Sequence, residues 1–598
     1  MYRVFFRVAL TGFTLGLLSL FAAGPQSAGA AQVALQAVPT ANEAAANEHF
    51  GQLIDQRLGV VPIDETQRDK AWRAQLKSFY AARGGTPVWV SAKGWTARAQ
   101  TALAELANAG NWGLDASAFP LPQLAGGTAA DDDLVSAEIA LSQTIVKYAH
   151  HAHGGRIDPS SLSLWLDRTP NDVYATAVMI DIISHSDAGA VLRDMHPRSE
   201  AFELLRQAYV ATRHEIQHPK TIDPAEILAP GKAIKVNEWH PDVLIVRKRL
   251  NAPALAGFES KFDEKLANLL DDALSEARVR VRWGTIDNVA RAFFNRPPPA
   301  PTTNDLMRIQ ANMERWRWLP RELGSTHIWN NLPEFLTRVV KNGEVIHQER
   351  IIIGQPDTQT PVFTNVMRQV VFQPEWGVPP SIKINDLLPK LQAGDTDVLE
   401  RRNMRILGLS GKELNPERFN WDKVDIRDIG IYQRSGDGNP LGRVKFLFPN
   451  RHHVYMHDTN NRALFKHAER TFSHGCVRVR DPERFAKVIL GEDKGWDSDD
   501  VEALLDNWKK PNNKIDLDRP IPVHNVYFTL VPGEGRTLIT LDDMYGHDKR
   551  VIQALSGVPA VKIALSDPAR NQQRELEEAA PPMVKKANAA ARARAEAE

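Results

Sequence analysis

Residues 455–459 read YMHDT and residues 471–478 read TFSHGCVR, and this stretch holds Cys476, the only cysteine among 598 residues. An unperturbed thiol has a pKa of about 8.5 and is only a few per cent thiolate at neutral pH. A nucleophilic cysteine therefore needs a base or a cation beside it. His457 and His474 are the candidates for that role, so the stretch predicts cysteine chemistry.

The sequence around this stretch predicts strands before the cysteine and a helix after it. Residues 443–448 and 453–457 partly alternate apolar and polar side chains, and a Pro-Asn turn separates them. Asp481 is a candidate N-cap for a helix that begins with Pro482. Gly475 permits a tight turn beside the nucleophile, so backbone N–H groups could face a developing oxyanion. Nucleophile, base and oxyanion donors are expected to meet in one place.

A histidine, fifteen intervening residues and the sequence SHGCVR closely resemble the active-site signature of L,D-transpeptidases with a YkuD-like catalytic domain. NPLGRVKF at residues 439–446 and MHDT at residues 456–459 are similar to the large, periplasmic YcbB-like branch of that family. The resemblance implies two-step acyl transfer in peptidoglycan. Cys476 attacks the diaminopimelate carbonyl of a donor tetrapeptide and the terminal D-Ala leaves. The diaminopimelate amine of an acceptor stem then resolves the thioester into a 3–3 cross-link.

The resemblance also implies roles for individual residues. His457 is expected to act as general base and acid for the cysteine. Five further residues are expected to shape the pocket or hold the substrate: Tyr455, Ser473, His474, Gly475 and Arg478. From the residues alone, Ser473 could equally satisfy a turn and Arg478 could equally form a salt bridge. We expect no cofactor and no metal, and we hypothesise that Cys476 and His457 rest as a thiolate–imidazolium pair. Acylation by carbapenems is a further implication of the family.

Other interpretations of the cysteine compete with this one. A lone cysteine is often a small buried hydrophobe, but the flanking residues argue against that here. Thiolate and imidazole are also zinc ligands, although no His-Glu-x-x-His or paired-cysteine spacing accompanies the nearby histidines, which are His452, His453, His457, His467 and His474. An exported L,D-carboxypeptidase would use the same residues with water as the acceptor. A non-catalytic wall-binding protein would not need the cysteine.

Composition and charge are those of an ordinary globular chain of three or more domains, with 43% hydrophobic and 24% charged residues. The 73 basic and 73 acidic residues cancel, so nothing indicates a nucleic acid or an electrostatically held membrane surface as partner. Residues 1–30 predict a secretory signal, with Arg3 and Arg7 before an apolar run at 8–24 and a small-residue cleavage site at 28–30. An uncleaved membrane anchor is the alternative. We expect a periplasmic protein whose single cysteine cannot form an internal disulfide.

The expected fold class is multidomain α+β, with a mostly β catalytic domain that carries an inserted cap. In chain order we expect a linker at 31–48, a helical scaffold at 49–230, a small helical peptidoglycan-binding-like domain at 235–296, a Pro-rich linker at 297–303, the catalytic domain at 304–560 and a disordered tail at 567–598. A polar, helix-prone insertion at about 379–432 is placed to act as a lid. The family's glycine-rich turn is poorly kept near residues 278–284, so a helical spacer is the alternative to glycan binding.

Periodicity predicts the main elements. Strands of the catalytic domain are expected at 334–340, 345–353, 370–376, 525–531 and 537–541, with an Asn-Gly hairpin turn at 342–343. Helices are expected at 95–106, with Thr96 as cap, and at 136–148. The expected substrates are peptidoglycan stem peptides, as donor and as acceptor.

Overall fold

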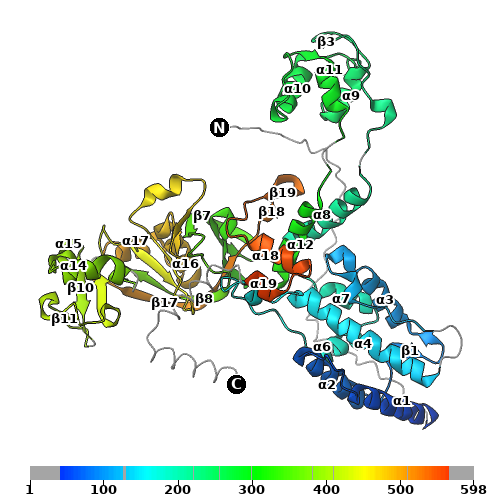
Figure 1. Cartoon of the computed structure of the whole chain (residues 1–598), viewed down its shortest axis with the longest axis horizontal. Helices are drawn as coiled ribbons and strands as arrows, with labels where there is room; N and C mark the ends of the chain where they lie inside the picture. The colour runs from blue at the N-terminus through cyan, green and yellow to red at the C-terminus, as the bar shows by residue number, and fades with distance from the viewer. Residues whose placement is uncertain are drawn as a thin grey trace, which may run out of the picture.

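The computed structural model describes residues 41–124, 130–219, 221–254, 256–297, 300–379, 382–408, 410–507 and 509–564. The signal sequence expected at 1–30, most of the linker and the tail expected at 567–598 lie outside these residues. A helical region, a small helical unit and a β-rich region follow one another along the chain (Figure 1). The small unit stands apart, whereas the helical and β-rich regions are in contact, as the bridge between Leu166 and Val362 shows. None of the helices in the described part combines the length and the apolar composition that crossing a membrane requires.

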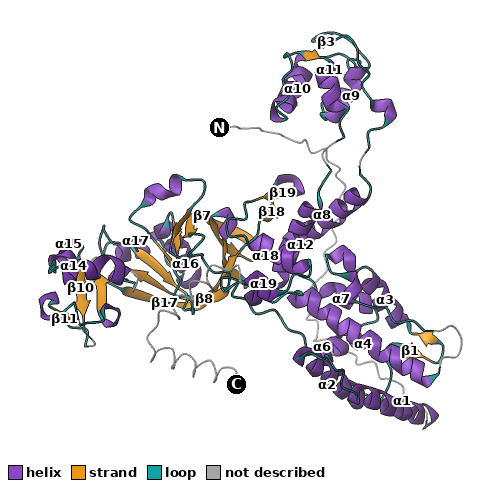
Figure 2. Cartoon of the chain, in the orientation of Figure 1, coloured by secondary structure: helices purple, strands orange, loops and turns teal. Residues whose placement is uncertain are grey.

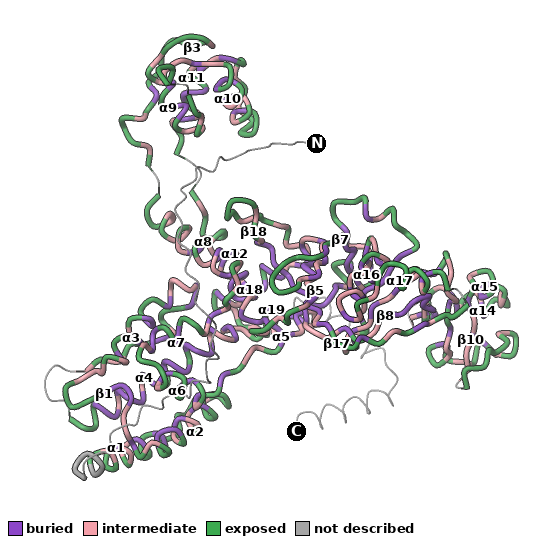
Figure 3. The backbone as a smooth tube through the Cα atoms, turned by 180° about the vertical axis from the view of Figure 1, so that it is seen from behind, coloured by how far each residue is buried: buried purple, intermediate pink, exposed green. Residues whose placement is uncertain are grey.

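The helical region is centred on α4 (Asp131–Gly154), which is buried along most of its length (Figure 3). The helices packed around it are α1 (Ala41–Gly59), α2 (Gln67–Ala82), α3 (Ala97–Ala107), α6 (Ala175–Ser184) and α7 (Ala188–Asp194). Glu138 of α4 accepts hydrogen bonds from the amides of Val88 at 2.6 Å and Trp89 at 2.8 Å, which fixes the loop before α3. Both helices predicted here are present, and Thr96 caps α3 by accepting from the Ala99 amide.

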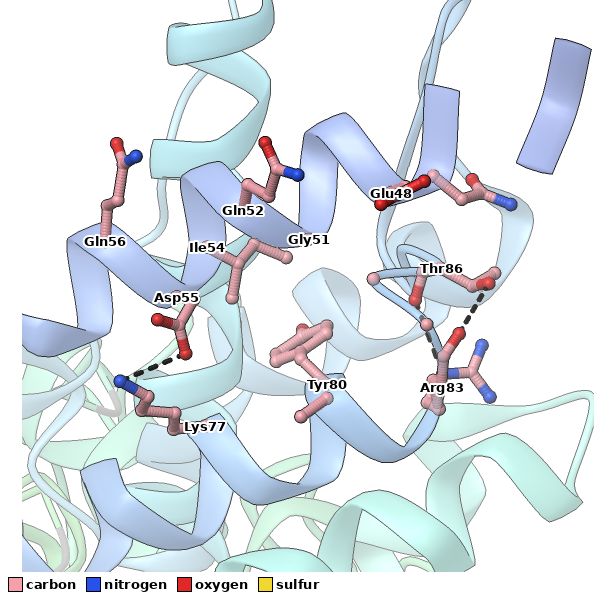
Figure 4. Close-up of a pocket in the computed structure, with 14 residues that line it drawn as sticks. Glu48, Gly51, Gln52, Ile54, Asp55, Gln56, Lys77, Tyr80, Arg83 and Thr86 are labelled. Carbon is pink, nitrogen blue, oxygen red and sulfur yellow. Dashed lines mark hydrogen bonds and ion pairs between the residues drawn. The ribbon is translucent and has the colours of Figure 1, made fainter. Parts of the chain in front are cut away.

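A surface groove of about 700 Å³ lies between α1, α2 and the loop at 83–86 (Figure 4). The Nζ atom of Lys77 lies 3.0 Å from an Oδ atom of Asp55, and this ion pair joins the two helices. Gly51 and Gly85 pack backbone against backbone, and a Cβ atom at either glycine would collide with the other. The groove contains none of the residues that the sequence places in the catalytic site.

The small unit has its own apolar core. Three helices, α9 (Asp242–Arg249), α10 (Glu264–Glu276) and α11 (Asn288–Phe294), surround Phe262 and Leu270. The short strands β3 (Ile234–Lys235) and β4 (Thr285–Ile286) pair antiparallel at its edge. The helices predicted in this segment are therefore present. The unit is joined to the rest of the protein between α8 (Glu200–Gln217) and α12 (Thr303–Arg317), which pack against each other (Figure 2).

The β-rich region is built on one nine-stranded sheet with the order β15-β7-β16-β14-β13-β8-β17-β5-β6. The strands are β5 (Thr326–Asn331), β6 (Leu336–Lys341), β7 (Glu344–Gly354), β8 (Thr364–Phe372), β13 (Val444–Leu447), β14 (Met456–His457), β15 (Thr471–Ser473), β16 (Val477–Val479) and β17 (Asn513–Val526). Because β6 also pairs with β7, the sheet closes on itself. Asn342 and Gly343, with φ of 51° and 86°, make the predicted hairpin turn between these two strands.

Helices complete the core of this region. The helix α16 (Pro482–Lys494) packs against β13 and β17, and α18 (His547–Leu555) packs against α12. Asp481 caps α16 by accepting from the Arg484 amide at 3.0 Å, and Pro482 occupies the first turn, as predicted. The rings of Phe446 and Phe485 meet edge to face with centroids 4.9 Å apart, which ties α16 to the inner face of the sheet.

Several strand predictions are wrong at their ends. The strand expected at 334–340 begins only at Leu336, and the strand expected at 453–457 is reduced to Met456 and His457. The strand expected at 525–531 is divided, because β17 ends at Val526 and β18 (Leu530–Pro532) forms a separate hairpin with β19 (Leu538–Thr540). Most of β17 lies before 525, where Pro520 and Pro522 weaken the strand signal, and the pairing with β8 shifts register between Asp516 and Ile521. The strand expected to run to residue 376 ends at Phe372.

The insertion also differs from the helix-prone segment that was expected. It contains a second sheet with the order β11-β10-β12-β9, in addition to short helices. The strands are β9 (Trp376–Gly377), β10 (Met404–Leu407), β11 (Glu413–Leu414) and β12 (Gly430–Gln433), and α14 (Leu388–Gln392) and α15 (Asp397–Arg401) pack beside them. Strands of two to four residues are too short to show period-two alternation in a sequence. The insertion lies at the end of the β-rich region far from the helical region (Figure 1).

Candidate active site

The pairing register of the large sheet arranges the predicted site residues on one face. Across the strands from β7 to β17, one continuous row of paired positions is formed by Ile352, Arg478, His457, Lys445, Val371 and Lys514. Directly paired residues on neighbouring strands point to the same side of a sheet. His457 therefore lies between Arg478 on one side and Lys445 on the other.

Cys476 lies on the same face of the sheet, two residues before Arg478 in the chain. Val477 pairs with Met456 in the parallel register, and its amide donates to the Tyr455 carbonyl at 3.1 Å. Met456 and Val477 are fully buried in the core, so the residues on either side of them point to the opposite face. Tyr455 and Cys476 are thus neighbours, and Cys476 and His457 are diagonal neighbours whose side chains occupy one surface.

Tyr455 packs within this group of residues. Its ring centroid lies 5.5 Å from that of His457 at an interplanar angle of 58°, and the Nζ atom of Lys445 lies 5.9 Å from the same tyrosine ring. Burial raises the pKa of the Tyr455 hydroxyl far above its ordinary value, and the Cys476 charge acts in the same direction. The Tyr455 hydroxyl therefore stays neutral, and its ring forms one wall of the site.

His457 is held in one tautomer. Its side chain is only 5% exposed, and its Nδ1 atom lies 2.5 Å from the Asp458 carbonyl oxygen. A carbonyl can only accept, so Nδ1 carries the proton and Nε2 presents a lone pair. The pKa of His457 is lowered to about 3, mainly by burial and in addition by the charges of Arg478 and Lys445, whereas the Asp458 carbonyl opposes them. The imidazole is neutral at neutral pH and can accept a proton at Nε2.

The cysteine is a neutral thiol at rest. Burial raises the pKa of Cys476 above its ordinary value, and the Tyr455 amide and the Arg478 charge offset only part of this effect. A raised thiol pKa and a lowered imidazole pKa both disfavour the thiolate–imidazolium pair hypothesised from the sequence. That hypothesis is corrected, because burial disfavours the charged form of each group.

The turn before the nucleophile is stabilised by its own polar groups. Gly475 has φ of 109°, and its amide donates to the Ser473 hydroxyl at 3.1 Å. The Ser473 hydroxyl in turn donates to the Cys476 carbonyl at 2.6 Å, so Ser473 satisfies the turn. The Gly475 amide is thus not free for an oxyanion, contrary to the expectation. Within the described residues the Cys476 amide makes no hydrogen bond. His474 is exposed to solvent.

Sequence reasoning missed two residues that position this turn from distant elements. The Thr360 hydroxyl donates to the Gly475 carbonyl at 2.8 Å. The Tyr545 hydroxyl donates to the Gly354 carbonyl at 2.5 Å and accepts from the Thr360 amide at 3.4 Å. No local sequence pattern predicts these contacts, because they join segments that are far apart in the sequence.

Asp458 is a third residue that was not singled out. Its carboxylate accepts from the amides of Arg443 at 2.9 Å and Thr459 at 2.7 Å. Gly442, with φ of 57°, lies so close that a Cβ atom there would collide with this carboxylate. The segment that follows the insertion is therefore hydrogen-bonded to Asp458, the residue next to His457. The sequence MHDT at residues 456–459 was used only for its resemblance to a family. The acidic residue Asp458, directly after the expected base His457, was the signal that could have indicated this contact.

The nearby histidines have other partners. His452 Nε2 lies 2.6 Å from a carboxylate oxygen of Asp167, and His467 meets the Phe472 ring edge to face. In the part of the chain that the structure describes, no group of three or more His, Cys, Asp or Glu side chains is arranged to hold a metal ion.

Two regions of the chain match known protein families. Residues 325–513, which include every predicted site residue, match the family described as the L,D-transpeptidase catalytic domain. Residues 74–208 match a family described as the scaffold domain. The fold is accordingly that of a multidomain protein of helices and sheet, in which a β-rich domain that matches the L,D-transpeptidase catalytic domain follows a helical region that matches the scaffold domain.

One relative and two solved structures are similar to parts of the chain. A Haemophilus influenzae protein named "Putative L,D-transpeptidase" is 30% identical over 255 residues, which cover 42% of this chain and 50% of the relative. The chain thus spans about half the length of that relative. An L,D-transpeptidase of Xylanimonas cellulosilytica covers 50% of this chain and 100% of its own at 13% identity, with a TM-score of 0.13. A fused Zn-dependent amidase, peptidase and peptidoglycan-binding protein of Clostridium acetobutylicum gives the same coverages at 11% identity and a TM-score of 0.14. Scores this low carry no argument.

Proposed function

We propose that this protein, whose residues 325–513 match the L,D-transpeptidase catalytic domain, forms 3–3 cross-links between peptidoglycan stem peptides through a thioester on Cys476. One observation supports this most strongly. A thiol and a neutral imidazole with an open Nε2 atom lie on one face of one sheet as diagonal neighbours. A nucleophile beside an oriented base is the arrangement that acyl transfer through a covalent intermediate requires.

In the first half-reaction the Cys476 sulfur attacks the diaminopimelate carbonyl of a donor tetrapeptide. As the S–C bond forms, the thiol proton passes to Nε2 of His457, and the Cys476 amide is the donor available to the oxyanion. The C–N bond to D-Ala then breaks, and the imidazolium returns the proton to the leaving amine. The Asp458 carbonyl, which accepts from Nδ1–H, stabilises the imidazolium while it exists.

In the second half-reaction the side-chain amine of an acceptor diaminopimelate attacks the thioester. His457 takes a proton from the attacking amine, the C–S bond breaks, and the proton passes to the sulfur. The base must be unprotonated at the start of both half-reactions, and the low pKa of His457 keeps it so at neutral pH. Arg478, two residues after the nucleophile, favours the sulfur anion as it attacks in the first half-reaction and as it departs in the second.

The further elements of the proposal concern location and inhibition. We infer that residues 1–30 direct export and that the protein acts on its substrate in the periplasm, in cell-wall biogenesis. The carbapenems, which acylate the active-site cysteine in this family, are expected to acylate Cys476. The small unit at residues 234–294 remains either a glycan-binding module or a spacer.

The test is mass spectrometry of products formed from tetrapeptide-bearing muropeptides by the protein lacking residues 1–30. Cysteine-dependent dimers linked from one diaminopimelate to another are the expected result, with Cys476→Ala as the control. Cysteine-dependent tripeptide monomers without dimers would instead identify an L,D-carboxypeptidase. Absence of turnover by the folded protein would favour the wall-binding alternative.

A further inference from the structure

Two cations flank the base on the site face of the sheet. Arg478 pairs directly with His457 in β16, and Lys445 pairs directly with His457 in β13. Neighbouring strands lie about 4.8 Å apart, so the two cationic residues are separated by roughly twice that distance at the backbone. Both side chains are partly buried. The base thus lies between two positive groups on the surface where the donor peptide must lie.

Neither cation has a counter-ion in the described residues. No ion pair or hydrogen bond involves the Lys445 ammonium or the Arg478 guanidinium, and the Arg478 Nε atom is buried without a partner. Buried arginines elsewhere are held, as Arg291 is by Asp242 at 3.1 Å and Arg168 is by Thr364 at 2.8 Å. A partly buried charge with no partner is costly, so two of them beside a base suggest that an anionic group completes the site.

The acid that acts on Lys445 is already engaged by other residues. Glu375 influences Lys445, but its carboxylate accepts from Arg405 at 2.7 Å and from the Asn512 amide group at 2.9 Å. Burial lowers the pKa of Lys445, and the like charge of Lys514 acts in the same direction. The positive charge of Lys445 is therefore only partly offset, because Glu375 is shared with Arg405 and no carboxylate of the described residues pairs with the ammonium.

We propose that Lys445 and Arg478 form a carboxylate-binding site that holds the donor stem peptide beside Cys476. A guanidinium can hold a carboxylate in a bidentate pair, whereas an ammonium supplies a compact charge from the other side. This inference rests on the proposed function for the identity of its ligand. A tetrapeptide donor carries two carboxylates near its reacting carbonyl, one at the terminal D-Ala and one on diaminopimelate, and both present the same chemistry.

The test separates binding from catalysis by using the full chain with Cys476→Ala. Binding of a free-carboxylate tetrapeptide is compared with binding of two analogues, one amidated at the terminal D-Ala and one amidated at the diaminopimelate carboxylate. Lys445→Met is expected to weaken binding of the free peptide about tenfold, which corresponds to about 1.4 kcal/mol. One of the two amidated peptides is expected to bind weakly to the protein that retains Lys445, and Lys445→Met should reduce its affinity little further. The carboxylate that is amidated in that peptide is the one that Lys445 and Arg478 hold.

Matched variants guard against misfolding. Lys445→Arg keeps the charge and should retain most of the binding. Lys514→Met removes an exposed lysine from the same row, two strands farther away, whose like charge acts against that of Lys445, so it should not weaken binding. The site is overturned if Lys445→Met weakens the free and both amidated peptides equally, or weakens none. Because the assay needs no turnover, carboxylate-dependent binding without cross-linking would overturn the proposed function alone.

Discussion

His457 and Arg478 are direct partners across the parallel strands β14 and β16, so a permanent cation lies beside the buried imidazole. The imidazole pKa falls to about 3, mainly through burial and with a contribution from the guanidinium. The same guanidinium lowers the pKa of the Cys476 thiol, though by less than burial raises it. Arg478 thus helps burial to keep the base unprotonated and also assists the nucleophile.

Alkylation of Cys476 should follow a raised thiol pKa. We expect the rate with iodoacetamide to rise continuously with pH through and beyond the ordinary thiol value of about 8.5. Arg478→Met, which removes the charge that favours the thiolate, should move this profile to higher pH. A rate plateau between about pH 5 and 8 would reveal a thiolate–imidazolium pair and contradict this account.

Replacement of the base should affect turnover more than substrate binding. His457→Gln removes the Nε2 acceptor, and we expect kcat to fall by roughly 10²- to 10⁴-fold, as is typical for loss of a general base. The dissociation constant of a tetrapeptide, measured in the Cys476→Ala background, should change little. A variant that kept its kcat would show that another group accepts the thiol proton.

Gly442 should tolerate no side chain. Its φ is 57° and a Cβ atom would meet the Asp458 carboxylate, so Gly442→Ala combines backbone strain with a steric collision. Gly394→Ala is the matched control, because Gly394 has φ of 84° and open space around its Cα atom. Urea unfolding should show a loss of about 1 kcal/mol for the control and clearly more for Gly442→Ala. Equal losses would mean that the contact with Asp458 contributes nothing.

The buried histidines predict instability in acid. Burial lowers the pKa of His151 to about 3 and that of His524 to about 4. Both are neutral in the fold but bind protons near pH 6.5 when the chain unfolds. Stability is therefore complete above about pH 6.5 and is lost as the pH falls toward the folded values, at roughly 1.4 kcal/mol per pH unit for each histidine. In urea titrations across this range, His524→Gln should unfold with a shallower dependence on pH, whereas an unchanged slope would contradict this prediction.

Local signals in the sequence were enough to predict several elements. Thr96 and Asp481 cap helices because a side-chain oxygen at that position satisfies amides two or three residues away, which is a purely local relationship. The hairpin at Asn342 and Gly343 is equally local. The spacing from His457 to Cys476 led to the family that residues 325–513 match, because the whole motif lies within residues 457–478.

Features that depend on pairing between distant strands were not predictable in the same way. Only the pairing register of β13 and β14, which places Lys445 opposite His457, shows that Lys445 lies beside the base. The sheet inside the insertion is built from strands too short to carry a pattern. The resting protonation was missed for a related reason, because burial of Cys476 and His457 is a property of the packed fold.

The central claim is that Cys476 carries the donor stem as a thioester, and a single-turnover chase tests it most directly. The protein is mixed with excess tetrapeptide donor that lacks an acceptor amine, and its intact mass is recorded before and after an acceptor stem is added. We predict an added mass equal to the tripeptide acyl group, absent from Cys476→Ala, that disappears as the 3–3 dimer forms. Formation of the dimer by Cys476→Ala, or an adduct on wild-type protein that an acceptor never discharges, would contradict the account.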